Sequence, residues 1–180
     1  MSLDCSILKG GYKLSYSICK ADFYYGAFLS VLINNGINPA IVELGDKRNI
    51  YELTTDNGAY KVYTKYVVNS KPKDKLWNVI ITEKESDEIS RFMDINDNVL
   101  FVVICAHKQL INNNTEIAIL KTDELKACID LDCNINKNFR LSIRKKKHSP
   151  YLSVYGTHRA DKVDGEDNTI KISRQRILEL

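Results

Sequence analysis

Hydrophobic positions in the first part of the chain follow a helical period before they begin to alternate. Over residues 21–35 apolar side chains recur every three to four positions, which predicts a helix that is apolar around much of its girth and largely buried. Gly36 follows this pattern directly, where a helix C-terminus favours glycine, and Pro39 prevents continuation. The sequence therefore predicts a first helix with a well-defined end.

Alternation of apolar and polar residues then predicts a β-hairpin over residues 50–68. Its tip carries Asn57-Gly58, the strongest short-range hairpin signal, because both residues tolerate positive φ. A turn at this dipeptide pairs Glu52 with Tyr63 and places two lysines diagonally beside the carboxylate on the same face, Lys61 and Lys65. We therefore expect one acidic and two basic side chains to share this face of the sheet.

Four further strands and two further helices are predicted from shorter patterns. We expect strands at 41–43, 76–82, 99–105 and 116–120, a helix at 87–93 with Ser86 as its N-cap, and a helix at 123–129 capped by Thr122. The segment 76–82 suits a central strand. The segment 99–105 is apolar without alternation, which indicates burial on both faces, with helices above and below it.

A second hairpin is expected later in the chain, formed by 139–144 and 151–155. Its alternation produces one apolar face, which we expect to pack inward. The other face and the tip carry basic and aromatic side chains: Arg140, Arg144, Tyr151 and Tyr155 on the strands, and Lys145, Lys146, Lys147 and His148 at the tip. Between Asp132 and Asp161 there is no acidic residue, so this segment carries about +7 and the remainder about −4 of the net charge of +3.

The order of these elements indicates a single α/β (α+β) domain in which a mixed central sheet is flanked by helices. At 180 residues the chain suits one domain with one substantial core. Within residues 1–180 we expect the core over approximately 20–130, a basic hairpin over 137–156 and a tail over 157–180.

Composition and short motifs indicate the cellular compartment of the protein. Its longest apolar run, 99–106, has eight residues and is too short to cross a membrane, and the N-terminus shows no secretory signal. Five cysteines without a CxxC pair argue against a disulfide framework and against a zinc site. We therefore expect a cytoplasmic protein without a membrane partner, and the lysine- and asparagine-rich composition suits a low-GC bacterium or its phage.

The helix, hairpin, strand, helix and strand between residues 21 and 106 resemble the core of the PD-(D/E)XK (restriction endonuclease-like) superfamily. Members carry an acid on the first hairpin strand and an acid–x–lysine on the next. On this resemblance Glu52 stands for the first acid and Lys65 for the lysine, while Tyr63 occupies the position of the second acid. The resemblance implies a nuclease-like core and Mg²⁺-dependent phosphodiester hydrolysis, in which Glu52 holds the metal and Lys65 supports the nucleophile or the leaving charge.

Tyr63 leaves this implied metal site one carboxylate short. Asp22, at the start of the first helix, is our candidate for a second Mg²⁺ ligand, and Glu43 and Asp46 are alternatives, since superfamily members are known to move an acid. Either an acid has migrated in this way, or the chain is a relative of the nucleases without catalysis. The simplest alternative is that Glu52 and the two lysines form an ordinary ion pair on a solvated face.

The basic hairpin points to a nucleic acid as ligand. Arginine grips phosphates and tyrosine rings stack on bases, a combination that suits single strands or groove edges of DNA or RNA. The same basic residues allow two alternatives. The first is a solvated basic loop, and the second is a non-enzymatic interaction protein of the immunity or anti-defence type, which would bind an acidic protein partner.

Other chemistry has little support in the sequence. Cys105 and His107 share one face of a strand, but the thiol ends a very apolar run and is expected to be buried and inert. Three histidines without an HExxH motif provide no convincing zinc site, and the hydrolase, dinucleotide and P-loop glycine motifs do not occur.

Overall fold

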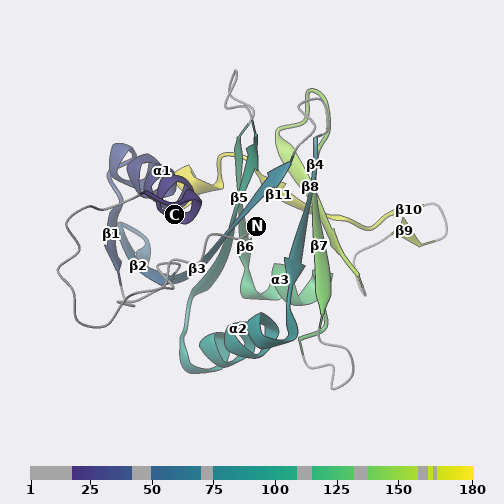
Figure 1. Ribbon diagram of the computed structural model, residues 1–180, viewed down its shortest axis with the longest axis horizontal. Helices are drawn as coiled ribbons and strands as arrows, with labels where there is room; N and C mark the ends of the chain where they lie inside the picture. The colour runs from purple at the N-terminus through teal and green to yellow at the C-terminus, as the bar shows by residue number, and fades with distance from the viewer. Residues whose placement is uncertain are drawn as a thin grey trace.

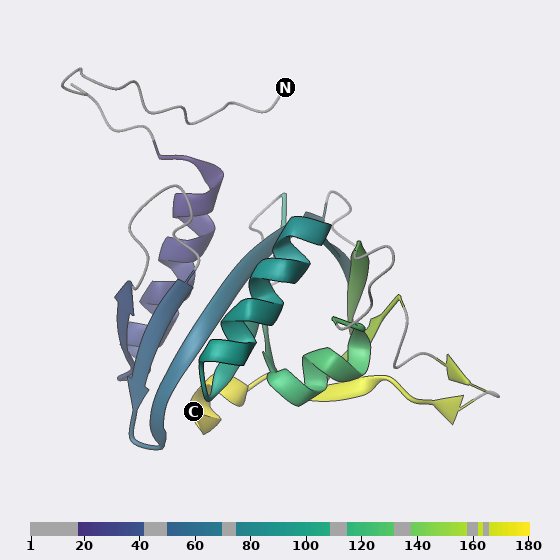
Figure 2. The same cartoon turned by 90° about the horizontal axis from the view of Figure 1, so that it is seen from below.

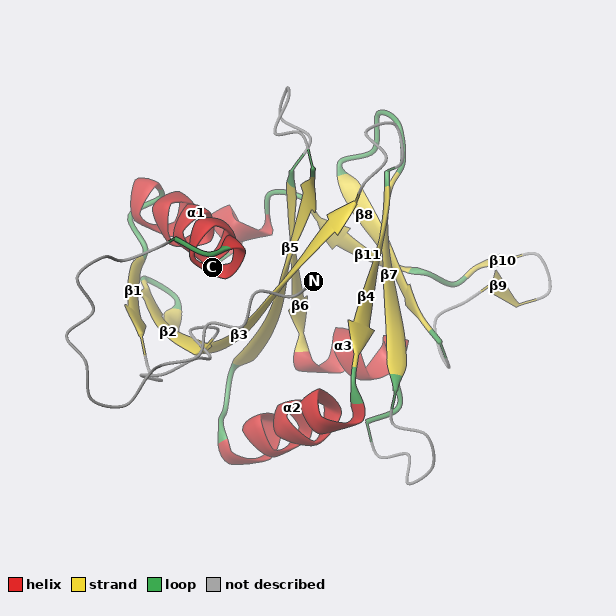
Figure 3. Ribbon diagram, viewed as in Figure 1, coloured by secondary structure: helices red, strands yellow, loops and turns green. Residues whose placement is uncertain are grey.

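Two larger β-sheets, a short strand pair and three α-helices make up the part of the chain that the computed structural model describes (Figure 1, Figure 3). The described residues are 18–41, 50–69, 75–108, 115–131, 138–157, 162–163 and 166–180. The architecture is of the predicted mixed α+β class, because one sheet combines parallel and antiparallel strands and carries helices on its faces.

The first sheet contains five strands in the order β1-β2-β3-β5-β6. Its strands are β1 (Asn38–Ile41), β2 (Ile50–Thr55), β3 (Gly58–Asn69), β5 (Val99–His107) and β6 (Glu116–Lys121). β1, β2 and β3 form an antiparallel meander, β5 runs parallel to β3, and β6 pairs antiparallel with β5. Parallel neighbours need a long crossover connection, and here that connection contains a strand and a helix.

The second sheet contains four antiparallel strands in the order β11-β8-β7-β4. These strands are β4 (Leu76–Ile81), β7 (Phe139–Lys145), β8 (Tyr151–Gly156) and β11 (Ile170–Ser173). A separate short pair, β9 (Lys162–Val163) with β10 (Glu166–Asp167), extends away from this sheet (Figure 1).

The prediction that 76–82 forms a central strand is wrong. β4 lies at the edge of the second sheet and pairs with β7. The reason lies in its alternation: Trp77, Val79 and Ile81 are buried, whereas Asn78 and Ile80 are exposed. A strand with one apolar face covers a core from outside, and only a strand with two apolar faces suits its centre.

Helices cover both faces of the first sheet. α1 (Lys20–Asn34) packs on one face, and α2 (Glu83–Ile95) and α3 (Thr122–Cys128) lie on the other, which is also the side of the second sheet (Figure 2). A 3₁₀-helix, η1 (Arg176–Glu179), brings the C-terminal residues to the apolar cluster beneath α1.

Two predicted helix caps are displaced. α2 begins earlier than expected, because Thr82 accepts a hydrogen bond from the Glu85 N–H while the Glu85 carboxylate accepts one from the Thr82 N–H at 2.9 Å. Ser86 is therefore a buried residue of the first turn. α3 is capped at Lys121, whose N–H donates to Glu124 at 2.8 Å, and Thr122 is its first helical residue.

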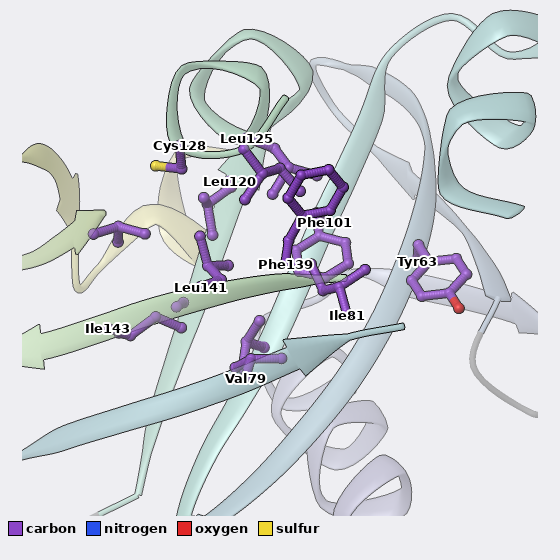
Figure 4. Close-up of a cluster of buried hydrophobic side chains, with 14 of the residues drawn as sticks. Tyr63, Val79, Ile81, Phe101, Leu120, Leu125, Cys128, Phe139, Leu141 and Ile143 are labelled. Atoms are coloured by element: carbon purple, nitrogen blue, oxygen red, sulfur yellow. The ribbon is translucent and has the colours of Figure 1, made fainter. Parts of the chain in front are cut away.

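β5 divides the core into two clusters. All nine of its residues are buried, which confirms the predicted burial on both faces. Leu100, Val102 and Ile104 belong to the cluster beneath α1. The residues between them face the second sheet, together with α2 and α3, and Figure 4 shows Phe101 in this cluster beside side chains from β4, β7 and α3.

Close contact between β8 and the end of α3 requires glycine at position 156. A Cβ atom at Gly156 would overlap the Cys128 carbonyl, a backbone group that cannot rotate away. We expect Gly156→Ala to lower the free energy of unfolding by about 3 kcal/mol, since overpacking a core forces backbone shifts.

Gly26→Ala is the matched control for this substitution. Gly26 lies in α1, where a Cβ atom would meet nothing within 4 Å beyond the adjacent residues and backbone of its own helix. Alanine there should raise stability by about 0.5–1 kcal/mol through helix propensity. Urea denaturation followed by circular dichroism measures both variants, and equal stabilities would contradict the close packing of β8 on α3.

Candidate nucleic-acid interface

The β2–β3 hairpin forms as predicted, but its register is shifted by two residues. Thr55 pairs with Gly58, so the turn is centred on Asp56-Asn57 and not on Asn57-Gly58. The Thr55 hydroxyl accepts a hydrogen bond from the Asn57 N–H at 3.2 Å, which favours this placement of the turn. Gly58 takes the positive φ, at 132°.

Glu52 consequently lies opposite Lys61, and the expected pairing with Tyr63 is wrong. The Lys61 ammonium donates to the Glu52 carboxylate at 2.7 Å, and both side chains are partly exposed. Tyr63 pairs with Ile50 instead and is buried against Phe101. Glu52 thus forms the ordinary cross-strand ion pair that was the simplest alternative.

Lys65 shares the face of Glu52, as expected, but it has a different partner. It lies four residues beyond Lys61 on β3 and forms an ion pair with Glu85 on α2. Burial by itself would raise the pKa of Glu85. Hydrogen bonds from Lys65 and Thr82 outweigh this effect and hold the pKa below its usual value. The two residues assigned to catalysis therefore belong to separate ion pairs.

Asp22 does not join Glu52 in a metal site. It lies on α1, which packs against the opposite face of the first sheet, and its carboxylate accepts a hydrogen bond from the Cys19 N–H at 3.1 Å. Glu43 and Asp46 lie outside the described residues. Within the described ranges no group of three or more His, Cys, Asp or Glu side chains could hold a metal ion.

The second hairpin has the two faces that the sequence predicts. Phe139, Leu141 and Ile143 on β7, with Leu152 and Val154 on β8, are at most 1% exposed and point into the core. The alternate residues point outward, and among the described residues no helix packs on this side (Figure 2). We call this side of β4, β7, β8 and β11 the outer face.

The outer face carries the predicted arginines and tyrosines. Arg140 and Arg144 are exposed, and neither forms an ion pair within the described residues. Tyr151 is 49% exposed and Tyr155 is half-buried. Polar residues lie between these side chains, and the Ser142 hydroxyl donates to Asn78 of β4 at 2.8 Å.

Lys145 lies apart from the other basic residues of the hairpin. Its strand partner is Leu152, so its side chain points inward, where the ammonium binds the Glu116 carboxylate of β6 at 2.5 Å. Arg174 binds the same carboxylate with two hydrogen bonds of 2.8 Å. Lys145 therefore fixes the hairpin to the first sheet and does not contribute to the outer face.

The tip of the second hairpin is basic and exposed. Lys146, Lys147 and His148 all lie in it, and His148 adopts a positive φ of 60°. The Ser149 N–H closes the turn by donating to the Lys146 carbonyl at 3.3 Å. The tip thus extends the positive charge of the outer face beyond the ends of the strands.

Sequence reasoning missed one basic residue of the outer face, Lys171. β11 places it beside Ser153, and its ammonium donates to the Ser153 hydroxyl at 3.2 Å. The signal was present in the sequence, because Ile170 and Ile172 alternate with Lys171 and Ser173. The partner strand of this short segment could not be identified from alternation alone.

Cys105 and His107 are both buried, as expected for the thiol. Burial raises the pKa of the Cys105 thiol well above its usual value, and the nearby Glu116 carboxylate adds to this effect. His107 packs edge-on against Trp77. A thiol that is buried and protonated is a poor nucleophile.

Comparisons with protein-family models, curated proteins and solved structures find no match to this chain. No helix in the described part of the chain is long and apolar enough to cross a lipid bilayer.

Stability should depend on pH through Glu116. Burial raises its pKa, but hydrogen bonds from Arg174 and Lys145 outweigh burial and hold the pKa below the usual value of 4.5. A lowered folded-state pKa contributes stability above the unfolded-state pKa and loses it as pH falls through the folded-state pKa. We expect Glu116→Gln to cost about 3 kcal/mol at pH 7, because two cations lose their buried partner.

The difference between wild type and Glu116→Gln should narrow as pH falls below the usual carboxyl pKa of 4.5, because the unfolded state takes up a proton first and the folded carboxylate, whose pKa is lower, takes it up later. Urea denaturation at pH 7, 5, 4 and 3 measures this. Glu52→Gln is the matched control, since its ion pair is partly exposed and should contribute less than about 1 kcal/mol. A stability difference between wild type and Glu116→Gln that stays constant with pH would contradict the role given to the Glu116 carboxylate.

Proposed function

We propose that this protein binds nucleic acid on the outer face of the second sheet and does not hydrolyse it at Glu52 and Lys65. The observation that carries the proposal is the combination of two exposed arginines, the exposed Tyr151 and the half-buried Tyr155 on one sheet face. Guanidinium groups that form no ion pair within the described part of the chain attract phosphates, and accessible rings accept bases. The segment from 133 to 160 contains no acidic residue, which supports the same ligand.

The ion pairs of the first hairpin support binding without cleavage. Metal-dependent hydrolysis needs carboxylates that converge on one ion, whereas the Glu52 carboxylate is bound by Lys61 and the Lys65 ammonium by Glu85. The relationship to PD-(D/E)XK nucleases stays a prediction, and the proposed function does not depend on it. An acidic protein partner, which the same cations would also attract, becomes an outcome of the binding test.

Arg140→Ala and Arg144→Ala should each weaken nucleic-acid binding roughly tenfold at about 0.1 M salt, equivalent to one charge-assisted contact of about 1.4 kcal/mol. Each should also reduce the slope of log K against log salt by about 0.7–0.9, one phosphate contact. Fluorescence anisotropy with labelled DNA and RNA across a salt series measures both effects.

Arg91→Ala provides the matched control, because Arg91 is an exposed arginine on α2, away from the outer face. It should leave both the affinity and the salt slope unchanged. Equal losses in all three variants would indicate attraction by net charge alone. The proposal would be overturned if both outer-face arginine variants bound nucleic acid as tightly as wild type, or if the protein bound no nucleic acid. Either result would favour an acidic protein partner.

Incubation of the wild-type protein with DNA and RNA in Mg²⁺ or Mn²⁺ should leave the strands intact, because the described carboxylates do not converge. Gel electrophoresis of end-labelled substrates measures this, with Lys65→Ala as the control. Metal-dependent cleavage that disappears in Lys65→Ala would overturn the non-catalytic part of the proposal. Cleavage that persists in Lys65→Ala would come from a contaminant or another site.

A further inference from the structure

Cations and tyrosines alternate in rows across the outer face. Arg144, Ser153 and Lys171 occupy neighbouring positions on β7, β8 and β11 and form one row. Tyr155 lies in the row on one side of it, and Tyr151 lies in the row on the other. Successive rows on one face of an antiparallel sheet are about 6.8 Å apart, twice the rise per residue.

Each tyrosine has a short side chain directly opposite it. Ser142 of β7 lies opposite Tyr155, and Ser173 of β11 lies opposite Tyr151. These serines are too short to cover an aromatic ring. Tyr151, which is 49% exposed, and the half-buried Tyr155 therefore flank the row that carries the positive charge.

The width of the sheet decides which nucleic acid can reach these rings. Four strands about 4.8 Å apart span about 14 Å before side chains are added. The major groove of B-DNA is about 12 Å wide and admits a helix or a two-stranded ribbon, and the minor groove is narrower. A duplex would meet the outer face with its phosphates only, since its bases stack on one another inside the helix.

We infer that the ligand of the outer face is a single-stranded nucleic acid whose bases stack on Tyr151 and Tyr155 while Arg140, Arg144 and Lys171 hold its phosphates. This inference rests on the proposed function and adds the substrate class. Single strands present unstacked bases, and a base–aromatic stack tolerates any sequence because every base has a π-face. DNA and RNA share this chemistry, so separate arms of the experiment distinguish them.

The test is fluorescence anisotropy with a labelled single strand of about 12 nucleotides, as DNA and as RNA, and with the matching duplexes, at one fixed salt concentration. Single strands should bind at least tenfold more tightly than duplexes. Tyr151→Leu and Tyr155→Leu should each weaken single-strand binding roughly tenfold and leave duplex binding unchanged. Tyr151→Phe, which keeps the ring, should bind within about twofold of wild type.

Phe23→Leu is the matched control for loss of an exposed ring. Phe23 lies on α1 and is 48% exposed, against 49% for Tyr151, so the two substitutions remove similar exposed aromatic groups from different faces. It should leave single-strand affinity unchanged. Thermal melts of all four variants check that each is folded.

Duplex binding through the hairpin tip is the competing outcome. The tip is a two-stranded ribbon, and Lys147 is exposed there. Equal affinity for duplex and single strand, with loss of duplex binding in Lys147→Ala and none in the tyrosine variants, would overturn the inference and leave the proposed function intact. No binding to any of the four nucleic acids would overturn the proposed function and the inference together.

Discussion

The burial of β5 on both faces is the constraint on which the rest of the structure depends. A strand without an exposed face needs apolar cover on two sides. α1 provides one cover, and α2, α3 and the apolar side of the second sheet provide the other. Trp77 adds a directed contact between the sheets, because its indole N–H donates to the Ala106 carbonyl at 3.0 Å. The second sheet is therefore part of the same core and not an appended module.

Use of the second sheet as a cover also determines where its polar residues lie. Strand side chains alternate, so the inward direction of Leu141 and Ile143 turns Arg140 and Arg144 outward. Glu116 then holds the two sheets together at one end, since a buried carboxylate of β6 binds both Lys145 and Arg174. The basic outer face is thus a consequence of how the core is covered.

The first hairpin was predicted correctly as an element, but the partners predicted for its charged side chains were wrong. A sheet has a side-chain period of two, so the two-residue shift in register keeps Glu52 and Lys65 on the predicted face. The same shift places Lys61 directly opposite Glu52 and leaves Lys65 to pair with Glu85, which arrives from α2. The Thr55 hydroxyl favours this register through a contact that the Asn57-Gly58 signal does not include.

The sequence by itself determined most helices and strands, the double burial of β5 and the two faces of the second hairpin. These properties follow from periodicity, which is local and survives in any arrangement of the elements. Only the tertiary structure decided that β4 belongs to the second sheet, that Lys145 points to Glu116, and that Lys171 joins the outer face. Each of these depends on which distant strands pair, and pairing is set by the shared core, which no short stretch of sequence encodes.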